Sequence, residues 1–454
     1  MRKKIVAQRS LFDQAIDLLI SIFKPEKKLI KMDAIIDANP DIITAVHADL
    51  TEWVMDYGCH GISAEQVVRS AILKQWKRYS YRELHERLND GVSFRWFSRF
   101  YSEPIPHFST LQKVIKSIKD ETWSRINEIL LRHARDKKLE NGKSLRTDTT
   151  VVETNITYPV DARLLWDSIR VLTRIMERSR LLLPELNFAF AKRTRKAKKL
   201  CYRIIMAKGA KADQRRQRPY KDLIKLANEV YHMASRCLRG LSKHPALEVL
   251  SLYEELEHYL TMSALAIDQC ERRVLKGEKV PVSEKIVSIF EEHTDIIKRG
   301  KTQSPTEFGH KVLVTTGKSG IITQYRTFRG NPSDLELFPD ILTIHQRQYG
   351  QAPDNICGDR RFFSSDNEKI AYRNGVKKVS ICKPGYHSKD RRQIEKERWF
   401  KDLQRFRAGI EGIISALMRG YGLKRCLWKG WQSFQSYVGL SVVTFNLQKI
   451  AELT

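Results

Sequence analysis

Three acidic side chains, Asp148, Asp359 and Glu411, lie where a plain surface charge is not expected. Asp148 falls in the β-branched run 147–152, which favours a strand. Asp359 follows the short apolar segment 356–358, and Glu411 borders an apolar helix face. Because burying a lone carboxylate is costly, acids in such places need a partner. A hard divalent cation is one such partner, since it relieves the repulsion between several carboxylates.

If the three carboxylates converge, the chemistry they predict is phosphoryl transfer. Two Mg²⁺ ions roughly 4 Å apart would activate a hydroxyl and stabilise the leaving oxygen of an in-line displacement. Arg407 lies four residues before Glu411, which places the two on one helix face where they can pair. Single acids at strand ends are also common structural residues, so this interpretation stays open on the residues alone.

Convergence requires a sheet that presents Asp148 and Asp359 and a helix that carries Glu411. Antiparallel strands followed by alternating strand and helix indicate a mixed α/β domain, interrupted by a helical stretch from about 161 to 280. The final portion, from about 390, is predicted to be helical. Strands are predicted at 145–152, 285–290, 311–316, 320–328, 353–358 and 376–382, with the turn of a hairpin at 316–320.

Residues 1 to about 140 are predicted to be helical. Capping boxes, in which a serine and a Glu or Gln three residues later satisfy each other's amides, mark three helix starts. The pairs are Ser63 with Gln66, Ser80 with Glu83, and Ser109 with Gln112. The first two begin helices of about 63–76 and 80–88, a pair that resembles a helix-turn-helix unit able to enter a DNA groove. Any helical bundle contains such pairs, so both interpretations remain.

Positive charge dominates the composition. Lys and Arg number 81 against 53 Asp and Glu, a net charge of +28 that favours a polyanionic partner over a merely soluble basic protein or a membrane surface. The run 192–218 holds twelve Lys and Arg and one acid, and its self-repulsion predicts disorder unless phosphates are near. The predicted contacts to the DNA backbone are Lys192, Arg193, Arg195, Lys196, Lys198 and Lys199, with Lys77 and Arg78 in the turn near the N-terminus.

Other classes of protein are disfavoured. The apolar stretch 18–23 is far too short to cross a membrane, and the basic N-terminus lacks the apolar core of a secretion signal. The seven cysteines are scattered without a CxxC pair, and Cys59-His60 has no downstream partner to complete a zinc site. This pattern fits a reducing cytoplasm with buried free thiols.

Four blocks of the chain, taken jointly, resemble bacterial insertion-sequence transposases of the DDE class. Segment 148–165 is similar to their first catalytic block and 301–314 to their second and third strands. The block Gly358-Asp359-Arg360-Arg361-Phe362-Phe363 resembles the one with the second aspartate, and 405–412 the one with the final glutamate. Residues 79–97 and 108–111 resemble the family's helical leader domain.

The resemblance implies an RNase H-like mixed-sheet catalytic domain with a long helical insertion and an all-helical N-terminal domain. The expected boundaries are 1–140 for the leader, 141–160 and 284–454 for the catalytic domain, and 161–283 for the insertion. It further implies that Asp148 bridges two Mg²⁺ or Mn²⁺ ions and that Asp359 and Glu411 bind one each. Arg407 would orient Glu411 or contact a phosphate, whereas Glu153 is expected in a solvated turn.

The activity implied is cleavage at terminal inverted repeats and joining of the freed 3′-hydroxyls to target DNA, by a DNA-bound homodimer at the nucleoid in the cytoplasm. The chain departs from the family pattern Tyr-x2-Arg-x3-Glu-x6-Lys, because Gln404 replaces the tyrosine and Met418 the lysine, with Arg419 one residue later. Arg361 stands where a glycine is frequent. Two alternatives therefore remain: a nuclease or resolvase that cuts without joining, and a transposase-derived DNA-binding protein without catalysis.

Overall fold

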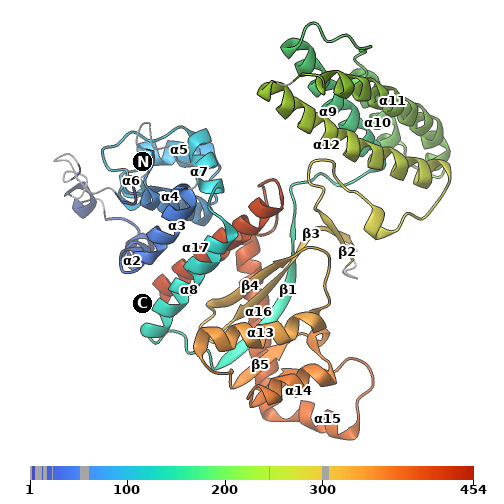
Figure 1. Cartoon of the computed structure of the whole chain (residues 1–454). Coiled ribbons are helices and arrows are strands. Elements are labelled where there is room, and N and C mark those ends of the chain that lie inside the picture. Colours follow the sequence, from blue (N-terminus) through green and yellow to red (C-terminus); the bar gives the residue numbers. More distant parts are fainter. Residues whose placement is uncertain are drawn as a thin grey trace. The chain divides into compact units, whose positions relative to one another are not determined.

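The computed structural model describes residues 3–5, 13, 18–22, 24–51, 61–244, 246–298 and 306–454. The chain divides into two compact units (Figure 1). The first combines Met1–Thr154 with Gly309–Thr454, and the second consists of Asn155–Phe308. Cys59 and His60 lie outside the described residues. In the described part, the helices are too short or too polar to span a membrane.

A mixed sheet forms the centre of the first unit. Its order is β2-β3-β1-β5-β6, and β4 pairs with β3. β1 is antiparallel to β3 and parallel to β5, and β5 is parallel to β6. β3 and β4 form the predicted antiparallel hairpin. The strands are β1 (Ser144–Glu153), β2 (Asp295–Lys298, within the second unit), β3 (Thr306–Thr316), β4 (Ile322–Phe328), β5 (Asn355–Gly358) and β6 (Lys378–Ile381).

Helices cover both faces of this sheet. Leu145 of β1 packs in a cluster with Phe338 and Ile341 of α13 (Asp334–Tyr349) on one face. Successive strand residues point to opposite faces, so Arg146 points to the other face, where α16 (Arg398–Gly420) contacts β1, β5 and β6. Short helices complete this part of the chain, namely η3 (Arg360–Phe362), α14 (Ser365–Arg373) and α15 (Lys389–Lys396).

The N-terminal helices share a core with the sheet through α17 (Trp431–Leu453). α17 is buried on nearly all sides and packs against α8, α4, α2 and β4, as Figure 1 shows for α8. One apolar cluster therefore includes side chains of the N-terminal helices, of β1, β3 and β4, and of α17. The helices are α2 (Lys27–Asp37), α3 (Asp41–Thr51), α4 (Ala64–Lys77), α5 (Tyr81–Asp90), α6 (Val92–Phe97), α7 (Phe108–Lys116) and α8 (Asp120–Asp136).

The second unit has a separate apolar core built from four long helices. These are α9 (Asp161–Leu182), α10 (Thr194–Met206), α11 (Ala212–Leu241) and α12 (Leu247–Cys270), followed by the π-helical η1 (Glu271–Leu275) and the 3₁₀ turn η2 (Val282–Glu284). The basic run 192–218 lies within the helical stretch predicted from about 161 to 280 and is mostly helical, in α10 and the first turns of α11. Ala197, Leu200 and Ile204 of α10 enter the core and anchor this helix along one face.

The mixed α/β class, the helical N-terminal region and the hairpin of β3 and β4 are confirmed. Two capping boxes are confirmed at Ser63 and Ser80. The third is wrong, because the N-cap of α7 is His107, two residues before Ser109, and the ring of His107 accepts from the Ser109 amide. The strand predicted at 285–290 is also wrong: this segment is irregular and buries Ile289 in the helical core.

Candidate metal and DNA site

Asp148 and Asp359 lie side by side on neighbouring parallel strands. The register of β1 and β5 pairs Thr147 with Gly358, and each aspartate is the next residue of its strand or just beyond it. Both side chains are partly exposed, although the positions around Asp148 in β1 are mostly buried. Each carboxylate accepts the amide of the following residue at 2.7 Å. The sheet therefore presents two accessible carboxylates next to one another.

The two aspartates face α16. Asp148 is two residues after Arg146, and residues two apart on a strand point to the same face. Nη1 of Arg146 donates to the Phe406 carbonyl of α16 at 2.8 Å, and its Nε donates to Thr316 Oγ1 at 2.8 Å. The guanidinium also lies 4.6 Å from the centroid of the Phe406 ring. Arg146 thus connects the strand that carries Asp148 to the helix that carries Glu411.

Gly409 leaves room for the Arg146 guanidinium between α16 and β1. A Cβ atom at this position would lie 2.1 Å from Nη1 of Arg146, a distance that real atoms do not adopt. Gly412, three residues later, has open space around it. The Arg-Ala-Gly-Ile-Glu segment therefore contains a glycine with a defined packing role two residues before Glu411.

Glu411 lies on α16, over the face that carries the aspartates, but it projects toward solvent. Its side chain is 65% exposed and accepts from Nη2 of Arg407 at 3.1 Å, so the predicted pairing of the two is confirmed. In the described part of the chain, no three His, Cys, Asp or Glu side chains are grouped closely enough to hold a metal ion. Two of the predicted acids are thus adjacent, and the third is on the helix packed over them.

The buried thiol of Cys357 and the half-buried thiol of Cys382 lie near charged groups at this end of the sheet. Burial raises the pKa of Cys357 to about 12, against the opposing effects of Arg146 and Arg407. Burial also raises the pKa of Cys382, which Asp359 raises further and Arg407 lowers. The charge of Arg407 therefore acts on both thiols, and the charge of Asp359 acts on Cys382. Gln404 donates to the Ser380 carbonyl at 2.7 Å and fixes α16 to β6.

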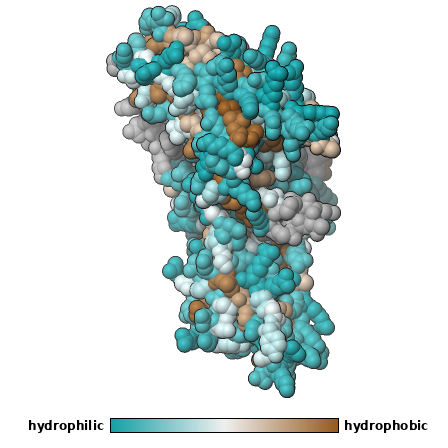
Figure 2. All heavy atoms as spheres, turned by 90° about the vertical axis from the view of Figure 1, so that its right-hand side faces the viewer, coloured by the Kyte–Doolittle hydropathy of each residue, from teal (hydrophilic) through white to brown (hydrophobic). Residues whose placement is uncertain are grey.

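The residues predicted to contact DNA fall into two groups, one in each unit. On α10, Arg195, Lys196, Lys198 and Lys199 are exposed and form no ion pair with any described residue. Lys192 and Arg193 pair with Glu177 at 2.7 Å and Glu229 at 3.7 Å. Hydrophilic side chains cover most of the face shown in Figure 2. The cations of α10 are therefore available to an external anion.

The second group lies in the turn between α4 and α5, which is partly covered. Lys77 pairs with Glu26 at 2.7 Å, and Nη1 of Arg78 donates to the Arg419 carbonyl at 2.8 Å. Glu153, expected in a solvated turn, is instead the last residue of β1 and accepts two bonds from Arg425, at 2.6 and 2.9 Å. The turn between α4 and α5 therefore packs against the end of α16, and the end of β1 packs against the segment that follows α16.

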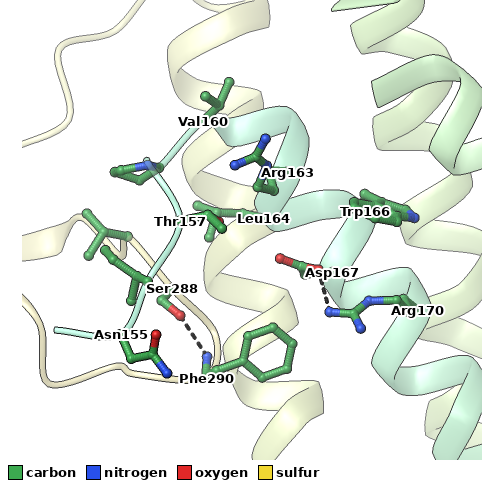
Figure 3. Close-up of a pocket in the computed structure, with 13 residues that line it drawn as sticks. Asn155, Thr157, Val160, Arg163, Leu164, Trp166, Asp167, Arg170, Ser288 and Phe290 are labelled. Atoms are coloured by element: carbon green, nitrogen blue, oxygen red, sulfur yellow. Dashed lines mark hydrogen bonds and ion pairs between the residues drawn. The ribbon is translucent and has the colours of Figure 1, made fainter. Parts of the chain in front are cut away.

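The second half of the block 148–165 leaves the sheet and lines a hollow of about 410 Å³ in the helical unit (Figure 3). Asn155, Thr157 and Val160 form part of its wall. Asp167 and Arg170 pair there at 2.7 Å, as the dashed line in Figure 3 shows. Because this wall belongs to the second unit, the block resembling the first catalytic segment contributes its aspartate to one unit and its tail to the other.

Sequence reasoning missed Arg146 and Gly409. Strand alternation would have placed Arg146 on the same face as Asp148, but an arginine in a polar run looks like an ordinary surface cation. Its burial is visible in the structure alone, where Arg146 is 8% exposed and burial lowers its pKa. Gly409 offered no signal in a single sequence, because glycine within a helix has several possible causes.

Two families of transposase domains match the chain. The family described as "Transposase domain (DUF772)" matches residues 18–117, and the family described as "Transposase DDE domain" matches residues 371–451. The second match includes Glu411, whereas Asp148 and Asp359 lie outside both. Neither a curated protein nor a solved structure matches the chain. The resemblance to insertion-sequence transposases of the DDE class is confirmed by these two domains.

Proposed function

We propose that this chain, which carries two transposase domains, is a metal-dependent DNA transposase whose catalytic acids are Asp148, Asp359 and Glu411. The observation that carries the proposal is the register of β1 and β5, which makes Asp148 and Asp359 neighbours on the face covered by α16. A mixed sheet with acids on adjacent parallel strands and an acid on the covering helix supports an RNase H-like catalytic domain. The helical unit would then be an insertion between β1 and β3.

The donor set fits the proposed ions. Carboxylate oxygens are the ligands that Mg²⁺ and Mn²⁺ accept most readily, and two of the three carboxylates are adjacent and accessible. When bound, a pair of such ions supplies an activated hydroxyl and stabilises the leaving oxygen. Asp148 would hold both ions, with Asp359 and Glu411 holding one each. Glu411 would exchange its contact with Arg407 for this role, leaving Arg407 to bind a DNA phosphate.

The remaining residues would position DNA. The exposed cations of α10 are suited to backbone phosphates and carry no base readout. We propose that the substrates are the terminal inverted repeats of an insertion sequence and a target duplex. The chain would act as a DNA-bound homodimer at the nucleoid, cleaving each end and joining the freed 3′-hydroxyl to the target.

The test is the Asp148→Asn variant. It removes a carboxylate charge at nearly constant volume, so Mg²⁺-dependent cleavage of the element's ends should fall by about a hundred- to a thousandfold, the scale seen when a charge-stabilising group is lost. Binding to the same end duplex should be unchanged. Asp366→Asn is the matched control, because Asp366 is an exposed aspartate on α14. Cleavage that persists in Asp148→Asn would remove the site assignment.

One observation favours a second candidate function, that of a transposase-derived DNA-binding protein. Glu411 is exposed and already paired with Arg407, and the lysine expected seven residues after it is Met418. Titration with Mn²⁺, followed by thermal unfolding, separates the two candidates. A catalytic triad should give Mn²⁺-dependent stabilisation that Glu411→Gln weakens. A chain that binds DNA with equal affinity but shows no response to Mn²⁺ would fit the second candidate.

A further inference from the structure

A cavity of about 680 Å³ opens in the first unit, at the far end of β1 from Leu145. Its walls come from the turn between α4 and α5, from the last residue of β1 and from the segment between α16 and α17. We call it the basic cavity, because four cations and two carboxylates line it. These are Lys74, Arg78, Lys424 and Arg425, with Glu83 and Glu153.

Both carboxylates of the basic cavity already have partners. Glu83 accepts the Ser80 amide at 2.7 Å within the capping box of α5. Glu153 accepts from two nitrogens of Arg425. No carboxylate in the described part of the chain pairs with Lys74, Arg78 or Lys424. The basic cavity therefore keeps an excess of positive charge.

Lys74 is the unusual member of this group. It is 8% exposed, and its ammonium makes no hydrogen bond or ion pair with any described residue. Its Nζ lies 4.8 Å from the centroid of the Tyr81 ring. The Tyr81 hydroxyl is buried beside Trp428 and has no hydrogen bond of ordinary geometry to any residue in the described part of the chain. Burial lowers the pKa of Lys74 to about 8, so the side chain is mostly charged at neutral pH.

A buried ammonium without an anion costs stability, and proteins keep such groups where a ligand supplies the missing charge. The N-terminus of α5, with its positive dipole end, also borders the cavity through Ser80 and Tyr81. Phosphate is the anion that suits both features, because it accepts several hydrogen bonds from ammonium and guanidinium groups at once.

We propose that the basic cavity binds a phosphate group of the DNA substrate, with Lys74 as its buried cation and Arg78 and Lys424 at its mouth. The assignment of this phosphate to DNA rests on the proposed function. Glu153 lies five residues beyond Asp148 on β1, a distance of about 17 Å along an extended strand. Because one DNA strand carries a phosphate about every 3.4 Å, a strand held at the acids reaches the cavity roughly five nucleotides away.

Thermal unfolding of the full chain tests the cavity directly. The midpoint is measured at pH 7 in inorganic phosphate and in chloride of equal ionic strength, for the wild type, for Lys74→Met and for Lys31→Met. Lys31 is an exposed lysine on α2 and serves as the matched control. Phosphate should raise the midpoint of the wild type and the control, but not that of Lys74→Met. The chloride midpoint of Lys74→Met should equal or exceed that of the wild type, because the variant removes an unpaired buried charge.

Affinity for a short labelled duplex then identifies the source of the phosphate. Lys74→Met should bind the duplex about tenfold more weakly than Lys31→Met, the effect of losing one hydrogen bond to a charged group. Unchanged duplex affinity with a lost phosphate response would show that the cavity takes free phosphate and would overturn the DNA assignment. A normal phosphate response, or a lower chloride midpoint, in Lys74→Met would overturn the cavity itself. Asp148→Asn should keep the full phosphate response, which separates this proposal from the catalytic one.

Discussion

Arg146 and Asp148 stand two residues apart on one strand, so their side chains leave the same face of the sheet. The types and settings of the three acids marked them as candidates in the sequence, and the resemblance to DDE-class transposases favoured them over other acids. The alignment of β1 with β5 was not, because register depends on contacts between residues more than two hundred positions apart. The sequence therefore predicted which acids to consider, and the sheet was needed to show that two of them are neighbours.

His345 gives a prediction at the scale of one residue. It is fully buried on α13, neither ring nitrogen has a hydrogen-bond partner among the described residues, and burial lowers its pKa to about 4. The unfolded chain, with an ordinary pKa near 6.5, binds the extra proton between these values, so stability falls as the pH falls from about 6.5 to about 4. The loss should approach about 3 kcal/mol.

Chemical denaturation at pH 7 and at pH 4.5 measures this loss. His345→Phe keeps an aromatic ring beside Tyr349, on which His345 stacks with centroids 4.5 Å apart, and removes the titrating group. The variant should lose less stability than the wild type between the two pH values. An equal loss in both proteins would show that other groups cause the acid sensitivity.

At the scale of elements, the capping-box pattern predicted the start of a helix correctly where no other residue competed with the serine for the N-cap position. The capping boxes at Ser63 and Ser80 formed as expected, whereas His107 took the N-cap position ahead of Ser109. The strand predicted at 285–290 failed for another reason. Its apolar residues found partners in the helical core, and a strand without a neighbouring strand has nothing to pair with.

Two glycines on α16 give a matched test of how this helix is seated. Gly409→Ala places a methyl group against Arg146, so it should destabilise the protein by about 1–3 kcal/mol and reduce end cleavage. Gly412→Ala meets open space and should stabilise it by about 0.5–1 kcal/mol, because alanine favours a helix over glycine. Denaturant unfolding measures both effects. Equal stability changes in the two variants would contradict the close approach described here.

The exposed face of α10 gives a second prediction at this scale. Replacing Arg195, Lys196, Lys198 and Lys199 with glutamine removes four unpaired cations while leaving the buried residues of the helix in place. If each contacts a phosphate, the slope of log affinity against log salt should become shallower by about 3–4. Fluorescence anisotropy with duplex DNA at several salt concentrations gives the slope. An unchanged slope would place the DNA path elsewhere.

At the scale of the whole molecule, the helical unit is inserted between β1 and β3, two antiparallel strands that pair with each other. Glu153 of β1 pairs with Gly309 of β3, so Asn155–Phe308 leaves and re-enters the sheet at adjacent points. The sequence indicated a long helical stretch through its composition and periodicity. A single sequence could not show that the two ends of this stretch lie on paired strands. No local sequence pattern specifies the pairing of two strands that are so far apart along the chain.

Replacing Thr154–Phe308 with a two-residue Asn-Gly turn between Glu153 and Gly309 should therefore leave a folded first unit, although this change also removes the edge strand β2. The turn type suits a two-residue hairpin, and the first unit has its own core. Circular dichroism should show mixed helix and strand content with one cooperative unfolding transition, while affinity for duplex DNA falls. Aggregation or non-cooperative unfolding of this shortened chain would show that the first unit depends on the helical one.

The position of α17 has a consequence for the order of events during protein synthesis. This helix is translated after every other described element, yet the N-terminal helices and the sheet bury much of their apolar surface against it. A ribosome-bound chain therefore has an incomplete core until α17 emerges from the ribosome. A copy whose translation stops before this helix would leave the apolar surface of the N-terminal helices and of the sheet exposed.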